Sequence, residues 1–117
     1  MYTYDGTIVN VVDGDTVDMA VDLGLDVSIS VRLRLYGINA PEMHGPTAAK
    51  GVAARQHLLD LLGGISAHVV IKTVKDRREK YGRYLATIYT GDTIPGTSVN
   101  QKMVDDGFAV PYFRGLR

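Results

Sequence analysis

The chain has 117 residues, 45% of them hydrophobic and 22% charged, which is the composition of one globular domain with its own core. Thirteen basic and thirteen acidic residues give a formal net charge of zero, which argues against a protein that coats nucleic acid without specificity. No cysteine is present, so disulfides and thiolate metal sites are excluded, and no apolar run is long enough to cross a bilayer.

The first two predicted strands flank a tight turn. Residues 4–12 are rich in β-branched side chains and predict a strand, and residues 16–21 predict a second one. Between them, Asp13-Gly14 is a hairpin signal, because glycine adopts the positive φ that such a turn needs. We expect the Asp13 carboxylate to bond to the backbone of the turn, and Asp15 to lie exposed just after it.

Residues 27–36, after a turn at 23–26, form the clearest predicted strand. Hydrophobic and polar side chains alternate along it with a period of two, which is typical of a strand with one buried face. The predicted core set is Val27, Ile29, Val31, Leu33 and Leu35. Arg34 belongs to the opposite, polar face, where we expect it to be available to a ligand.

Helix and strand patterns alternate in the rest of the chain. Thr47 is expected to cap a helix that runs to Leu62 and stops at Gly63-Gly64, and Ser98 with Gln101 forms a capping box for a second helix. The buried stripe of the first helix is expected to be Ala54, Leu58, Leu61 and Leu62. The other elements are a strand at 67–74, a polar loop at 75–83, a strand at 84–89, a loop at 90–97, the second helix to residue 107 and an extended segment at 108–113. Five strands, with a helix between the third and the fourth, fit a Greek-key barrel of the OB type, and composition alone leaves other α+β folds open.

Three short runs, far apart in the sequence, share one chemical theme. They are Asp13-Gly14-Asp15-Thr16, the run from Arg34 to Glu42, and Lys80-Tyr81-Gly82-Arg83. Each places charged side chains on or beside a tight turn. Together they offer carboxylates for a hard cation and arginines for the planar, bidentate grip of a phosphate. This combination is what the hydrolysis of a phosphodiester requires.

In this order and wording, the three runs resemble the staphylococcal nuclease-like (thermonuclease) family. A further pattern at Val99, Asn100, Met103, Val104 and Gly107 fits the same family, so the resemblance spans residues 4–112. It implies a single domain over residues 1–117 with an α+β, mostly β fold. The implied architecture is a five-stranded OB-fold Greek-key barrel with two helices, without the C-terminal helix that relatives usually carry.

The resemblance assigns metal binding to three residues. Asp15 matches a carboxylate ligand, and Ala40 matches a residue that contributes only its backbone carbonyl. Asn39 stands where relatives have an aspartate that binds calcium. An amide oxygen is neutral, so we expect the affinity for calcium to be lower than in relatives. From the residues alone, Asp15 can also be a plain turn aspartate.

Catalytic roles follow from the same resemblance. Arg34 and Arg83 match arginines that bind the scissile phosphate, and Glu42 matches the glutamate that deprotonates or orients the attacking water. Lys80, Tyr81 and Tyr112 match positions that contact the substrate, although a structural role for Tyr112 stays open. A surface position for Glu42 and a solvated basic loop are the alternatives that the residues themselves allow.

The expected function is a divalent-metal-assisted endonuclease that hydrolyses phosphodiester bonds of DNA and RNA with little sequence specificity. Calcium, or another divalent cation, is the expected cofactor, and single-stranded DNA or RNA is the expected partner. The alternative is a weak or inactive nuclease-like OB module that binds nucleic acid or a protein. The N-terminus lacks a signal pattern, so we expect a cytoplasmic location without a membrane partner, unless a signal is cleaved from a longer precursor.

Overall fold

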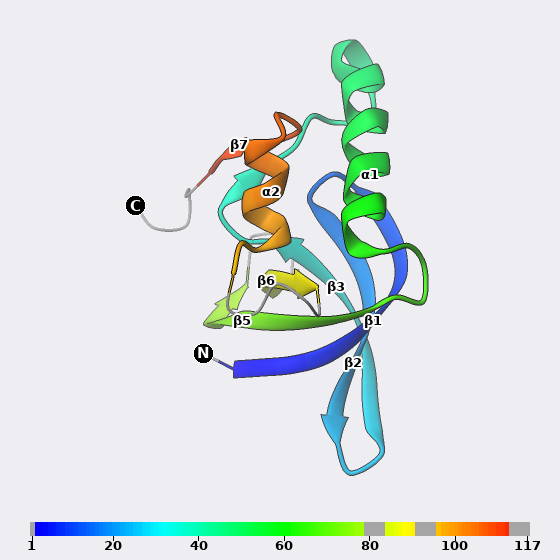
Figure 1. Cartoon of the computed structure of the whole chain (residues 1–117), viewed down its shortest axis with the longest axis vertical. Coiled ribbons are helices and arrows are strands. Elements are labelled where there is room, and N and C mark those ends of the chain that lie inside the picture. Colours follow the sequence, from blue (N-terminus) through cyan, green and yellow to red (C-terminus); the bar gives the residue numbers. More distant parts are fainter. Residues whose placement is uncertain (1, 79–83, 91–95, 113–117) are drawn as a thin grey trace.

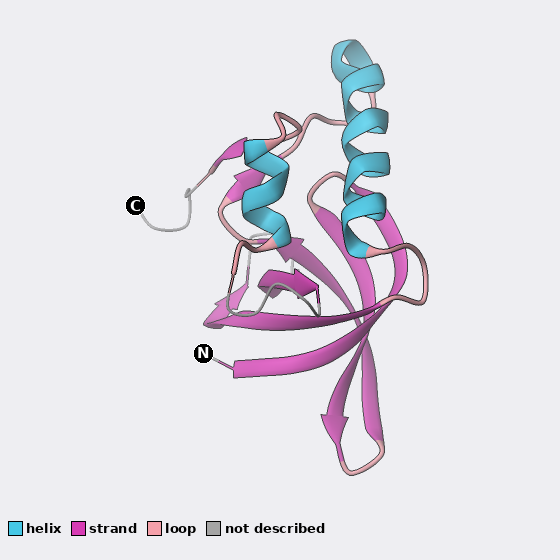
Figure 2. Ribbon diagram, viewed as in Figure 1, coloured by secondary structure: helices cyan, strands magenta, loops and turns pink. Residues whose placement is uncertain are grey.

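The computed structural model describes residues 2–78, 84–90 and 96–112. Strands form most of this part of the chain, with two α-helices and one 3-10 helix between them (Figures 1 and 2). In chain order the elements are β1 (Tyr2–Asp13), β2 (Thr16–Gly24), β3 (Val27–Leu35), β4 (Ile38–Asn39), η1 (Gly45–Thr47), α1 (Ala48–Leu62), β5 (His68–Arg78), β6 (Tyr84–Thr90), α2 (Val99–Asp105) and β7 (Val110–Pro111).

Five of the strands close into a barrel in the order β1-β2-β3-β6-β5, because β5 pairs with β1 as well as with β6. All pairs are antiparallel except β3 with β6, which run parallel. This confirms the predicted five-stranded OB-type barrel with two helices. The short strands β4 and β7 pair as a separate sheet, which the sequence pattern did not reveal. Figure 1 shows α1, α2 and this small sheet gathered at one end of the barrel.

The core fills the barrel and continues between the barrel and the helices. It consists of aliphatic side chains from all five barrel strands and both α-helices. The largest fully buried side chains are Ile8, Met19, Leu33, Leu35, Leu58, Leu62, Ile71, Ile88, Met103, Val11, Val17 and Val69. Within the described residues, no helix is both long enough and apolar enough to span a bilayer.

The buried face predicted for β3 holds for only half of the strand. Leu33 and Leu35 are almost fully buried, whereas Val27 is 51% and Ile29 is 44% exposed. Figure 1 gives the reason: β2 and β3 run on as a hairpin that projects away from the barrel. Alternation of residue types identifies a strand correctly, but it does not say how far the strand extends beyond the core.

The predicted end of the fourth barrel strand was wrong. The expected loop began at Lys75, but β5 continues to Arg78, which pairs with Tyr84 of β6 after an irregularity in the register. Backbone pairing holds this segment as a strand, and the charged residues that suggested a loop are compatible with strand geometry.

Both helices begin and end close to the predicted positions. Ser98 caps α2, because its Oγ accepts a hydrogen bond from the Gln101 backbone N–H at 3.0 Å. Thr47 precedes α1 but does not cap it through its side chain, since its Oγ1 donates to the Glu42 carbonyl. The buried residues of α1 are Gly51, Ala54, Leu58 and Leu62, so Leu61 is only partly buried.

Candidate active site

The turn between β1 and β2 is held as the sequence predicts. The Asp13 Oδ1 accepts a hydrogen bond from the Asp15 backbone N–H at 3.1 Å. Gly14 lies against two alanines: a Cβ at this position would be 2.7 Å from the Ala40 Cβ and 2.8 Å from the Ala54 Cβ. A larger residue would push the turn away from α1 and from the segment after β4. The glycine therefore fixes where Asp15 lies, in addition to its role in the turn.

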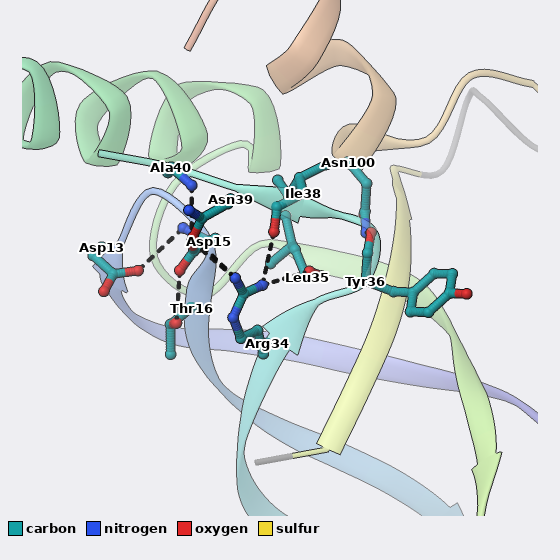
Figure 3. Close-up of polar contacts among 10 residues, drawn as sticks. All are labelled: Asp13, Asp15, Thr16, Arg34, Leu35, Tyr36, Ile38, Asn39, Ala40 and Asn100. Atoms are coloured by element: carbon teal, nitrogen blue, oxygen red, sulfur yellow. Dashed lines mark hydrogen bonds and ion pairs between the residues drawn. The ribbon is translucent and has the colours of Figure 1, made fainter. Parts of the chain in front are cut away.

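Asp15 is buried, which corrects the expectation of an exposed turn residue. Only 8% of its surface is exposed, because the segment after β4 crosses over it. Its Oδ2 accepts from the Ala40 backbone N–H at 2.9 Å, and its Oδ1 accepts from the Thr16 hydroxyl at 3.1 Å (Figure 3). Through its bond to Ala40, the Asp15 carboxylate thus holds the segment directly after β4 against the β1–β2 turn.

Arg34 is also buried, at 9% exposure, although a ligand-accessible position was expected. It does lie on the outer face of the barrel, beside Thr16 of β2, but the segment after β3 folds back over it. Its Nη1 donates to the carbonyls of Leu35 at 3.0 Å and Ile38 at 2.8 Å. These two bonds fix the backbone between the end of β3 and β4 on the guanidinium.

The other terminal nitrogen of Arg34 joins the two side chains predicted to bind metal. Its Nη2 donates to the Asn39 Oδ1 at 3.1 Å and lies 3.6 Å from the Asp15 Oδ2 (Figure 3). The oxygens of Asp15 and Asn39 therefore converge on one point, and that point is occupied by a cationic group of the protein itself. Tyr112 lies on the same guanidinium, with the ring centroid 5.6 Å from the Arg34 Cζ.

The donor set suits a hard cation but is poor in negative charge. The residues expected to bind metal would offer a carboxylate from Asp15, an amide oxygen from Asn39 and a backbone carbonyl from Ala40, all of the kind that calcium takes. In the structure, the Ala40 group that contacts Asp15 is its backbone N–H. Across residues 2–78, 84–90 and 96–112, no three histidine, aspartate or glutamate side chains come together as a metal site. A divalent ion held here would thus be bound mainly through neutral oxygens and water.

Asp13, the second carboxylate of the turn, is harder to ionise than an ordinary aspartate. Burial, followed by the hydrogen bond and the negative charge of Asp15, raises the pKa of Asp13 to about 6. A cation beside Asp15 would relieve this repulsion.

A second ion pair joins β2 and β3. Arg32 bonds to Asp18 at 2.8 Å and lowers the pKa of that carboxyl group.

Glu42 lies on the exposed surface just beyond this cluster. Its side chain makes no hydrogen bond or ion pair with the described residues, whereas its backbone is fixed. The Glu42 carbonyl accepts from the Thr47 hydroxyl at 3.0 Å, and a Cβ at Gly51 would lie 2.3 Å from that carbonyl oxygen. The absence of a side chain at Gly51 lets α1 pack directly on this peptide. The structure thus holds the backbone of Glu42 in place and leaves its carboxylate to solvent.

One supporting residue was not recognised from the sequence as part of the site. Asn100 of α2 is 4% exposed and its amide nitrogen donates to the carbonyls of Tyr36 and Ala86, while its Oδ1 accepts from the Ile88 N–H. It joins Tyr36, which directly follows β3, to β6, and Figure 3 shows its side chain beside Tyr36. Its place in the V-N pattern at 99–100, on an otherwise apolar helix face, was the available signal.

The predicted site residues are only partly brought together by the described structure. Asp15, Arg34, Asn39 and Ala40 form one bonded cluster, and Tyr112 joins it through Arg34 and through its backbone N–H, which donates to the Gly37 carbonyl at 2.7 Å. Three predicted residues, Lys80, Tyr81 and Arg83, lie outside the described residues.

Comparison with known proteins identifies the family of the chain. The family described as staphylococcal nuclease homologue matches residues 32–116, which include Arg34, Asn39 and Glu42. A micrococcal nuclease of Shigella flexneri is 35% identical over 114 residues, covering 93% of this chain and 59% of the relative. An uncharacterized endonuclease of Escherichia coli O157:H7 is 33% identical over 107 residues, covering 92% of this chain and 60% of the relative. A protein named ParB of Escherichia coli is 35% identical over 112 residues, covering 92% and 56%. The chain thus spans less than two thirds of the length of these relatives. Because the family model matches most of the chain, the chain belongs to the staphylococcal nuclease homologue family.

Proposed function

We propose that this chain is a divalent-metal-assisted endonuclease that hydrolyses phosphodiester bonds in single-stranded DNA and RNA with little sequence specificity. Membership of the nuclease family makes phosphodiester cleavage the first function to consider. The observation that carries the proposal is the convergence of the Asp15 and Asn39 oxygens on the Arg34 guanidinium. The oxygens that we propose for cation binding and the group that we propose for phosphate binding thus lie within one bonded cluster.

Arg34 has donors left for a phosphate. Its Nη1 is used for the Leu35 and Ile38 carbonyls, and these bonds set the orientation of the guanidinium plane. Its Nη2 is bonded to Asn39, an exposed and neutral amide, which a charged phosphate oxygen would replace readily because charge-assisted hydrogen bonds are stronger. The remaining Nε–H makes no hydrogen bond with the described residues. Nη2 and Nε together form the planar fork that suits two phosphate oxygens.

Glu42 is the proposed proton acceptor. Its carboxylate is exposed, follows Ala40 by two positions and is not used in any ion pair within the described part of the chain. It would accept a proton from the water that attacks the phosphorus, while the Arg34 donors hold the phosphate oxygens on which negative charge develops. Arg83 is the proposed second phosphate-binding group, on the basis of the family motif alone.

Asp15, Asn39 and the Ala40 carbonyl are the residues that would hold calcium or a similar ion. The bound ion would supply positive charge beside the phosphate and would compensate the crowded carboxylates of the β1–β2 turn. Asn39 supplies no charge, so we expect the ion to bind weakly.

A nuclease-like module that binds nucleic acid without cutting it is the second candidate. The observations that favour it are the neutral Asn39 and the use of three Arg34 hydrogen bonds within the protein. In that case nucleic acid would bind, and the phosphodiester would remain intact.

Cleavage of labelled single-stranded DNA and RNA separates the two candidates. The wild-type protein is incubated with calcium, magnesium or manganese, and with chelator, and the Glu42→Gln variant is treated identically. Asp60→Asn is the matched control, because it removes one exposed carboxylate of α1. We expect metal-dependent cleavage by wild type and Asp60→Asn, and a loss of about two orders of magnitude or more in Glu42→Gln.

The outcomes are distinct for each candidate. Binding of the oligonucleotide without cleavage under any metal condition would establish the non-cutting module. Equal rates for wild type and Glu42→Gln would remove Glu42 from the reaction while leaving the nuclease proposal in place.

A further inference from the structure

The projecting half of β3 carries a symmetric sequence. Residues 26–32 read Asp-Val-Ser-Ile-Ser-Val-Arg, which is the same in both directions around Ile29 except for the charges at its two ends. Two such segments placed antiparallel, with Ile29 opposite Ile29, would match every valine with a valine and every serine with a serine. The match covers Val27 to Val31, since Asp26 belongs to the hairpin turn, with a φ of 62°, and β3 begins at Val27.

One edge of this segment is open within the described structure. β2 pairs with β3 along its whole length on one side, whereas β6 pairs only with Leu33, Arg34 and Leu35 on the other side. No other described strand pairs with residues 27–32. The open edge therefore begins where the barrel ends, at the base of the projecting hairpin (Figure 1).

The backbone groups at this edge can be assigned from the bonds that flank it. The Leu35 N–H donates toward β2, to the Asp15 carbonyl, and the Tyr36 N–H donates toward β6, to the Ala86 carbonyl. Since N–H groups alternate in direction along a strand, the even-numbered residues turn their backbone toward the open side. Ser28 and Ser30 thus present their N–H and C=O groups at the edge.

The edge lacks the features that usually prevent strand association. It contains no lysine and no proline, and residues 27–31 carry no charge at all. Val27 is 51% and Ile29 is 44% exposed, on the face that farther along holds the buried Leu33. A strand that is exposed, uncharged and β-branched favours pairing with another strand.

We propose that a second copy of this chain pairs with the Val27–Val31 edge, antiparallel and with the two-fold axis at Ile29. In this register Ser28 of one copy and Ser30 of the other exchange both backbone hydrogen bonds, as the direction of their N–H groups requires. Val27 lies opposite the Val31 of the other copy, and the apolar faces of the two hairpins become neighbours in one continuous sheet. The interface is isologous, so it closes as a dimer.

The paired residues define the register. β3 begins at Val27, because Asp26 lies in the hairpin turn with a φ of 62°. The proposed pairing therefore uses Val27 to Val31, and it leaves Arg32 bonded to its own Asp18 at 2.8 Å. A shift of the antiparallel register by two residues would place valine opposite Ile29 and would remove the match of Val27 with Val31. The interface uses none of the residues of the candidate active site, so it does not depend on the proposed function.

Single cysteines test this register directly, because the native chain has none. Ile29→Cys would place two sulfurs across the two-fold axis in a pair whose Cα atoms are about 4.5 Å apart, which is suitable for a disulfide. Val27→Cys is the matched control: its two copies would be about 14 Å apart, at about 3.4 Å per residue. Leu25→Cys, at the 98% exposed hairpin tip, measures random collision. Each variant is oxidised with glutathione disulfide and examined on non-reducing gels.

We expect rapid cross-linking of Ile29→Cys, slow cross-linking of the two controls, and rapid cross-linking of Val27→Cys when mixed with Val31→Cys. In parallel, light scattering of the wild-type protein should give twice the chain mass of 12.7 kDa. The Ile29→Lys variant should have the mass of the monomer, because a dimer would bring two positive charges together on the two-fold axis. Equal cross-linking rates for all variants would overturn the proposal. Wild type that remains monomeric at about 200 µM would also overturn it, and would leave the edge to solvent or to another strand.

Discussion

Removal of the Asp15 side chain should destabilise the protein even without metal or substrate. In the folded chain Asp15 is buried and accepts hydrogen bonds from the Ala40 N–H and the Thr16 hydroxyl. The Asp15→Ala variant loses both acceptors and leaves a buried backbone N–H without a partner. The variant also removes the carboxylate that lies 3.6 Å from Arg34.

The size of the effect can be estimated from these contacts. An unpaired buried N–H costs about 1–3 kcal/mol, and we take about 2 kcal/mol for Ala40. Removal of one partner of a buried ion pair costs about 3–5 kcal/mol when the other charge is left unpaired. Arg34 keeps its three bonds to Leu35, Ile38 and Asn39, and its Nη2 is 3.6 Å from the lost carboxylate, so we take about 1 kcal/mol for this pair. The total of about 3 kcal/mol corresponds to a decrease in Tm of roughly 12 °C, at about 4 °C per kcal/mol for a chain of this length.

The matched variant is Asp15→Asn, which keeps an acceptor for the Ala40 N–H, removes the charge, and places an amide NH2 where the Thr16 hydroxyl now finds an acceptor. We expect it to cost about 1 kcal/mol, or roughly 4 °C. Thermal unfolding is followed by circular dichroism in buffer that contains chelator, so that metal binding does not contribute. A Tm for Asp15→Ala within about 3 °C of wild type would show that the carboxylate does not hold the segment after β4.

Three further predictions concern the same cluster. Arg34→Lys should lower the cleavage rate by about two orders of magnitude, since an ammonium with three donors cannot hold two loop carbonyls and also present a planar fork to a phosphate. A wild-type rate would exclude Arg34 from phosphate binding. Asn39→Asp should lower the calcium concentration for half-maximal cleavage by about tenfold and enlarge the calcium-dependent rise in Tm, which parallel titrations of the two proteins would measure. Because the folded-state pKa of Asp13 is raised from 3.8 to about 6, its proton stabilises the folded protein below about pH 4, and this contribution is lost as pH rises to about 6. Melting curves in chelator should thus show Asp13→Asn more stable than wild type at pH 8, with the difference shrinking toward pH 4, and a constant difference would refute this assignment.

Local signals predicted the strands, turns and helices, whereas the choice of the OB barrel among α+β folds depended on the family resemblance. Alternation along residues 27–35, the Asp13-Gly14 turn and the Ser98 cap each depend on a few neighbouring residues, and each is present in the structure. The length of the β2–β3 hairpin outside the barrel could not be predicted in this way. It depends on where β6 begins to pair with β3, and that residue is far away in the sequence.

The sequence motifs predicted residues that lie close together, but not how they are packed. The motifs named Asp15, Arg34 and Asn39, and the structure joins them through Arg34. Their burial was missed, because it depends on the segment after β4 folding over them and on close approaches at Gly14 and Gly51. In a sequence, a glycine such as Gly14 indicates a turn, and a glycine inside a helix, such as Gly51, indicates a weaker helix. In the structure, the lack of a side chain at both positions lets α1 approach the site.

The position of Arg34 would couple the proposed metal binding to the proposed phosphate binding. Asp15 and Asn39 both direct oxygens at the Arg34 Nη2, so the guanidinium lies where a cation held by these oxygens would lie. An ion bound by these oxygens would compete with Nη2, and the released Nη2 would be available to a phosphate oxygen. An aspartate at position 39 would strengthen calcium binding but would also hold Arg34 more firmly in the metal-free state. The neutral Asn39 weakens both interactions. We therefore expect Asn39 to reduce the affinity for calcium while it lowers the cost of freeing Arg34, so that the rate at saturating calcium is affected less than the calcium requirement.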